Sequence, residues 1–143
     1  MGYEYAAEGT IKVTPPIPFP VIRELTEGPN LPIFCLAPSL DDPEAAGPWS
    51  DIVGLWALIP EDVPLDQGQP ITVGALRMSH ISKSAAIGVP LARFVRLCHE
   101  AGHEVASDVK FSGEGGEHGV IEVTGGGITW VETYAPGREP TRW

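Results

Sequence analysis

Residues 89–111 read VPLARFVRLCHEAGHEVASDVKF, and the spacing of their apolar side chains changes part-way along. In the first half, apolar residues recur at the three- and four-residue spacing of a helix; these are Leu91, Phe94, Val95 and Cys98. Pro90 suits a helix start, and Gly102 suits a helix end. From Glu104 onward apolar and polar residues alternate, as in a strand. The stretch predicts a main helix over 89–102 that leads directly into a strand.

Five further segments have strand patterns. Residues 3–14 alternate apolar with polar side chains and predict a half-buried strand, which the Pro15-Pro16 pair stops. The apolar runs at 51–60 and 70–82 are joined by a polar, turn-rich segment and predict an antiparallel pair. GVIEVT and ITWVETY flank the glycines at 125–127, which predicts a hairpin because glycine readily adopts the positive φ of tight turns.

The remaining segments complete a fold prediction. The sequence PFPVIREL at 18–25 predicts a short helix with Val21, Ile22 and Leu25 inward. Residues 26–50 are rich in Pro and Gly and predict a long loop that covers the core through residues 33–36. Residues 135–143 form an irregular tail. We expect a single domain over 1–143 of the α+β class, with an antiparallel sheet of about five strands and the main helix packed on one face.

The charge balance excludes several classes of partner. The chain has 9 Lys and Arg against 19 Asp and Glu, a net charge of -10. Such a surface opposes binding to nucleic acid or to an anionic membrane, whereas it suits basic protein partners or mimicry of nucleic acid. The N-terminus lacks the basic and apolar regions of a signal peptide, and no segment reaches the length of a membrane span. We therefore expect a cytoplasmic protein in which Cys98 is a reduced, buried thiol.

The segment His99-Glu100-Ala101-Gly102-His103 spells the HExxH signature of zinc peptidases. In those enzymes both histidines bind zinc from one helical face, while the glutamate acts as general base on a zinc-bound water. Zinc held by His99 and His103, with His118 as a third ligand and Glu100 as the catalytic base, is therefore one hypothesis. The acidic, Gly-rich loop around His118 also offers Glu114 and Glu117 as ligands.

Three observations oppose this zinc hypothesis. At about 100° per residue, His99 and His103 point sideways and outward from the apolar stripe of the helix. The alternation after Gly102 places His103 beyond the helix end. Ala106 and Val109 stand where the longer zinc-binding pattern would need Gly and His. We therefore expect no metal, no cofactor and no catalytic residue, with zinc as the alternative.

Aromatic residues in irregular segments are the candidates for partner contact. Trp56 and Trp130 lie in apolar strands and are expected in the core, whereas Trp49 and Trp143 lie in stretches expected to be exposed. We predict partner contact through Trp49, Trp143 and, in the long loop, Phe34.

Residues 1–17 and 89–143 together suggest a family. The first stretch, MGYEYAAEGTIKVTPPI, combines Met-Gly-Tyr, an alternating strand, a glycine and a Pro-Pro pair; the second contains a helix ending in glycine, a strand, an acidic Gly-rich turn and a short strand. In these features the chain resembles small uncharacterised proteins of bacteriophages and actinobacterial genomes. The resemblance implies an accessory protein of phage or mobile-element type, with no catalytic residues to carry over. It also implies that His103 is the first residue of a strand.

From these observations we expect a non-enzymatic, acidic accessory protein, associated with a phage or mobile element, that binds a protein partner, possibly encoded by the host. A small zinc-dependent hydrolase that uses the HEAGH segment is one alternative. A nucleic-acid mimic is another, because carboxylates spaced like phosphates would compete with DNA for basic proteins.

Overall fold

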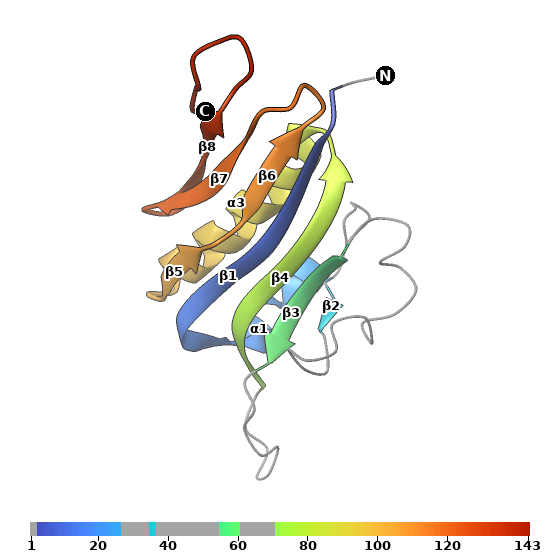
Figure 1. The fold of residues 1–143 in the computed structure, drawn as a ribbon. Helices are drawn as coiled ribbons and strands as arrows, with labels where there is room; N and C mark the ends of the chain where they lie inside the picture. Colours follow the sequence, from blue (N-terminus) through green and yellow to red (C-terminus); the bar gives the residue numbers. More distant parts are fainter. Residues whose placement is uncertain (1–2, 27–34, 37–54, 61–70) are drawn as a thin grey trace.

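The computed structural model describes residues 3–26, 35–36, 55–60 and 71–143, and its centre is one large, mostly antiparallel sheet (Figure 1). The strands are β1 (Tyr5–Pro18), β2 (Cys35–Leu36), β3 (Leu55–Pro60), β4 (Thr72–Ser82), β5 (Glu104–Ser107), β6 (Lys110–Gly113), β7 (His118–Thr124) and β8 (Gly127–Tyr134). Their order is β2-β3-β4-β1-β6-β7-β8, and β5 pairs with β1 off this path. The expected mixed fold with an antiparallel sheet is confirmed in outline, but the sheet exceeds the predicted five strands.

Helix α3 (Ser84–Glu100) packs behind this sheet, on one face only (Figure 1). Its buried residues are Ile87, Leu91, Phe94, Val95 and Cys98. The predicted start at 89 is wrong, because α3 begins five residues earlier and carries Pro90 inside. Burial of Ile87, one turn before Leu91, extends the apolar stripe toward the N-terminus and offsets the backbone hydrogen bond that Pro90 cannot donate.

β1 lies between β4 on one side and β5 with β6 on the other. The prediction that Pro15-Pro16 stops this strand is wrong, since β1 continues to Pro18. Pairing with β4 skips from Lys12 opposite Ala75 to Ile17 opposite Val73, so the prolines occupy a bulge. A bulge tolerates prolines because its residues are not required to donate ladder hydrogen bonds.

The predicted strand over 104–111 is divided into β5 and β6 opposite Gly9. The Asp108 carboxylate accepts a hydrogen bond from the Thr10 amide at 2.6 Å, and the Asp108 amide donates to the Thr10 carbonyl at 3.0 Å. Gly9 has a φ of 144°, and a Cβ there would lie 2.7 Å from Val109 Cα. The close approach of the two backbones therefore requires glycine at position 9.

The short helix is present as α1 (Phe19–Ile22), continued by a 3-10 turn over Arg23–Thr26. Ile22 and Leu25 are buried as predicted, whereas Val21 is 44% exposed and that part of the prediction is wrong. β3 and β4 form the expected antiparallel pair, and Gly125, with a φ of 62°, lies in the expected β7–β8 hairpin turn.

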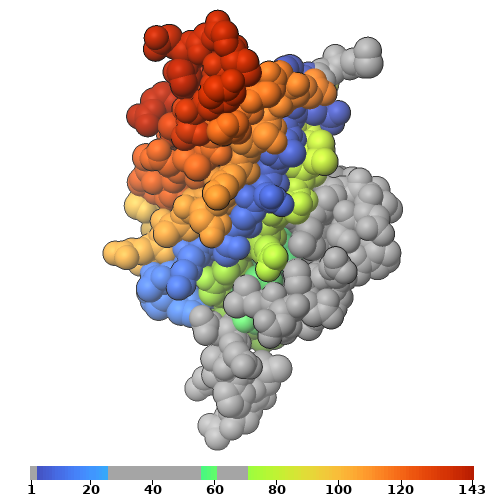
Figure 2. All heavy atoms as spheres, in the orientation of Figure 1, coloured from blue at the N-terminus to red at the C-terminus, as the bar shows by residue number. Residues whose placement is uncertain are grey.

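The face of the sheet opposite α3 is visible in Figure 2, where β4, β1, β5 and β6 lie side by side. None of the helices in the described ranges is long and apolar enough to cross a membrane. The predicted long loop over 26–50 lies outside the described residues apart from its first residue and Cys35–Leu36, which pair in parallel with β3.

Candidate functional site

The end of α3 decides the geometry of the HEAGH segment. Gly102 donates its amide hydrogen to the His99 carbonyl and His103 donates to the Cys98 carbonyl, each at 3.0 Å. With Gly102 at a φ of 88°, these two bonds form a Schellman motif, which closes a helix. The predicted end of helical structure before His103 is confirmed, although α3 itself ends at Glu100 and not at the predicted residue 102.

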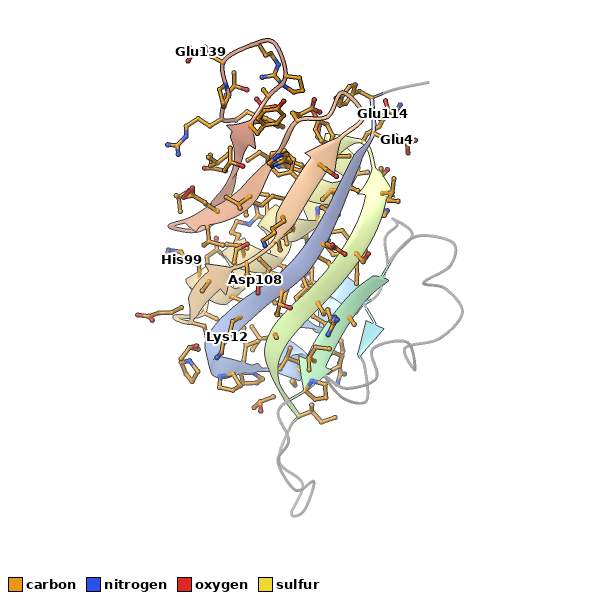
Figure 3. The ribbon with its side chains drawn as sticks, viewed as in Figure 1. Glu4, Lys12, His99, Asp108, Glu114 and Glu139 are labelled. Atoms are coloured by element: carbon orange, nitrogen blue, oxygen red, sulfur yellow. The ribbon has the colours of Figure 1, made fainter. Side chains whose placement is uncertain are left out.

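His103 binds the backbone of β1. Its Nδ1 lies 2.6 Å from the Pro15 carbonyl oxygen. A carbonyl oxygen only accepts, so Nδ1 donates this hydrogen bond. His99 is exposed on the last turn of α3 (Figure 3), and a Cβ added at Gly126 of the β7–β8 turn would lie 3.0 Å from its Cδ2.

His99, His103 and Glu104 line one open hollow of about 460 Å³ at the C-terminal end of α3, with Val105, Val123 and two glycines. The hollow therefore contains both histidines of the signature. His118 is not part of it, because this residue begins β7 and stacks on Tyr134, with ring centroids 5.2 Å apart. Within the described ranges, no group of three or more His, Cys, Asp or Glu side chains is arranged to hold a metal ion.

The opposite end of the sheet carries a cluster of five aromatic rings, called the aromatic end below: Tyr3, Tyr5, Phe111, Trp130 and Trp143. Trp143 stacks on Trp130 with ring centroids 5.5 Å apart and planes 13° apart, and Tyr5 contacts both tryptophans. Trp130 is buried as predicted. Trp143 is 46% exposed, which agrees with its predicted exposure but leaves its role in partner contact a prediction.

The tail 135–143 is joined to the outer edge of β8. Trp130 and Trp143 exchange two backbone hydrogen bonds, at 2.7 and 2.9 Å, and Glu132 donates its amide hydrogen to the Thr141 carbonyl at 2.9 Å. The tail was predicted to be irregular, and it forms an isolated bridge, not a named strand. It nevertheless occupies the edge of β8 in the way that an added strand would.

Glu132 is a buried carboxylate that binds this tail. It is 6% exposed, and both of its oxygens accept hydrogen bonds from the Arg138 guanidinium at 2.6 Å. The backbone amide and hydroxyl of Thr141 donate to Oε1 at 2.9 and 2.8 Å. Hydrogen bonding from Arg138 is the main cause that lowers the pKa of Glu132 to about 2, although burial acts in the opposite direction.

Glu117 is the second buried carboxylate at this end, in the turn between β6 and β7. It accepts a hydrogen bond from the Tyr3 hydroxyl, which in turn accepts one from the Gly115 amide. The bond to Glu117 and partial burial raise the pKa of Tyr3. The two buried carboxylates therefore hold both ends of the chain, Glu117 through Tyr3 and Glu132 through Arg138 and Thr141.

Sequence reasoning missed this arrangement. Trp49 and Phe34, predicted to contact a partner, lie outside the described residues. Glu117 was considered only as a metal ligand in a solvated loop, and Glu132 was not singled out. One signal was available for Glu132: in ITWVETY it alternates in phase with Ile128 and Trp130, so it falls on the buried face.

Two further residues have structural roles, of which that of Cys98 was predicted. Cys98 is fully buried, and burial raises the pKa of its thiol to about 12, which leaves it unreactive. His80 accepts a hydrogen bond at Nδ1 from the indole nitrogen of buried Trp56 at 3.1 Å, and burial lowers its pKa.

Comparison of the chain with protein-family models, with curated proteins and with solved structures gave no match.

Proposed function

We propose that this protein acts by binding another protein, as an accessory factor of phage or mobile-element type, and that the aromatic end is the surface it uses. One observation carries the proposal. Tyr3 and Trp143 of the aromatic end are 44% and 46% exposed. Tyr134, the last residue of β8, is 50% exposed and stacks on His118, which follows the Glu117 that binds Tyr3. Exposed aromatic rings grouped on one surface are typical of protein interfaces, where they supply much of the binding energy.

The charges near the aromatic end suit a basic protein partner. The chain has a net charge of -10, and its described residues contribute 11 acidic against 9 basic side chains. The carboxylates labelled at the aromatic end, Glu4, Glu114 and Glu139 in Figure 3, suit a basic rim on the partner.

Site-specific photo-crosslinking tests the proposal. A photoreactive phenylalanine analogue replaces Tyr134 at the aromatic end or, as control, Val89, which is 67% exposed on α3. In cells that contain the protein, we expect a cross-linked protein from position 134 and not from 89. That protein, once purified, should bind the chain at least tenfold more weakly when Tyr134 is alanine. Cross-links that do not depend on position, or equal affinity for both chains, would refute the proposal.

A zinc-dependent hydrolase with His99 and His103 as ligands and Glu100 as base is the second candidate, because both histidines line one hollow. Elemental analysis of protein purified without chelator or metal affinity resin distinguishes the candidates. One zinc per chain that is lost in His99→Ala would favour the hydrolase, while zinc-free protein would favour the binding function.

A further inference from the structure

The outer edge of β8 together with Glu132 and Trp130 forms a seat for an extended peptide, and the chain's own tail occupies it. All the tail contacts just described are ones that a separate peptide makes with a sheet edge: backbone pairing, an arginine fork on a carboxylate, and a ring stacked on a ring. Residues 135–137 connect the tail to β8, and Gly137 among them has a φ of 71°. The seat itself belongs to the body of the fold, since Trp130 and Glu132 lie on β8.

We propose that this seat, called the β8 groove, binds an extended segment of a partner protein that carries an arginine and, five residues later, an aromatic ring, after displacing residues 138–143. This inference rests on the proposed function and names the partner's chemistry. The spacing is that of Arg138 and Trp143 in the tail. Thr141 adds a position between them, whose amide and hydroxyl both donate to Glu132.

Glu132 makes the groove selective for arginine. In the described part of the chain, Arg138 is the cation within ion-pair distance of this carboxylate. An incoming segment that excludes water while bringing no cation would leave a buried charge without a partner, which strongly disfavours its binding. Both carboxylate oxygens point to one guanidinium, and arginine matches that two-pronged geometry whereas lysine does not.

Displacement must overcome the tail's attachment. A short tether gives a tail an effective concentration on the order of 1 mM, so a partner with only the same contacts would not compete well. Additional contacts are available beside the groove. Ile128 alternates in phase with Trp130, so its backbone groups face the same outer edge beyond Trp143, and Tyr3 and Tyr134 are exposed nearby.

Peptide binding to the full chain tests this inference. The probe is the acetylated hexapeptide REPTRW, and the chain carries Arg138→Gln with Trp143→Ala, which weakens the tail without altering the groove. We expect the backbone amide signals of Trp130 and Glu132 to shift on titration, with affinity at least tenfold above that of the wild-type chain. Replacing the peptide's first arginine by glutamine should weaken binding at least tenfold, whereas the same change at its fifth residue should have little effect.

Two results would overturn the inference: no binding to the weakened chain, or equal binding of the two glutamine-containing peptides. Hydrogen exchange of the wild-type chain provides a test if the variant fails to fold. Amides of Trp130 and Trp143, bonded between β8 and the tail, should exchange at least tenfold faster than that of Val131, which faces β7. Equal rates would mean that the tail never opens alone. Either failure leaves the cross-linking result at Tyr134 unaffected.

Discussion

Replacement of Glu132 by glutamine should destabilise the fold through one well-defined set of contacts. The carboxylate accepts two hydrogen bonds from Arg138 and two from Thr141. Glutamine keeps one oxygen, which can still accept from Thr141. Its amide group, however, presents donors to a guanidinium that has only donors. The variant therefore loses the ion pair, and the Nη2 group of Arg138 loses the carboxylate oxygen that accepts its hydrogen bond.

The size of the effect follows from burial. Breaking a fully buried ion pair by removing one partner costs about 3–5 kcal/mol. Glu132 is almost fully buried, but the Arg138 side chain is 47% exposed, and water takes up part of the lost interaction. A discount of roughly one half gives about 2 kcal/mol. For a chain of this length that corresponds to a fall in Tm of roughly 6–8 °C.

Denaturant unfolding of wild type and Glu132→Gln at several pH values measures this difference. The pKa of Glu132 lies near 2 in the fold, below its ordinary value of 4.5, so the ionised form stabilises the folded state. The stability difference should be complete above about pH 5 and should shrink as the pH falls from 4.5 toward 2. The matched control is Glu139→Gln, which removes an exposed charge from the same tail.

Equal stability of wild type and Glu132→Gln at pH 7 would refute the reasoning. So would a difference that stays constant down to pH 2.5, because the loss would then come from packing and not from the charge. A loss of similar size in Glu139→Gln would assign the effect to net charge in place of the buried contact.

Gly9→Ala should lower the free energy of unfolding by more than Gly102→Ala when both are measured by denaturant titration. Both positions have positive φ, but only a Cβ at position 9 would collide with neighbouring backbone, while Gly102 has open space. His103→Ala should cost about 1 kcal/mol through the lost hydrogen bond to β1, whereas His99→Ala should be near neutral. In native protein at pH 8, alkylation followed by mass spectrometry should leave Cys98 unmodified, because its thiol is buried with a pKa of about 12.

The parts of the fold that the sequence predicts are those where local pattern and tertiary environment agree. Strict alternation identified β1, the glycines identified the β7–β8 hairpin, and Gly102 marked the end of helical structure. The start of α3 could not be predicted, since Gly88 and Pro90 are both poor helix residues. Gly88 is accommodated for a tertiary reason: a Cβ there would lie 3.3 Å from the Trp130 indole nitrogen.

The candidate site was predicted less well than the fold. Trp143 was recognised as an exposed aromatic residue, but its stack on Trp130 joins two residues that pattern alone does not connect. Glu132 and Arg138 pair across a turn of the chain, and Glu117 reaches Tyr3 from the far end of the sequence. Such contacts depend on how the sheet brings the two ends of the chain together. The local spacing of apolar residues in the sequence does not predict this.

The closeness of the two chain ends has a practical consequence for experiments on this protein. Tyr5 and Trp143 lie with ring centroids 6.0 Å apart, and both ends of the ribbon lie at the same end of the sheet (Figure 1). An affinity tag or fluorescent label fused beside Tyr3 or Trp143 would therefore crowd the aromatic end. The exposed turn at Gly125, where an added Cβ has no neighbour within 4 Å, is the better place for a label.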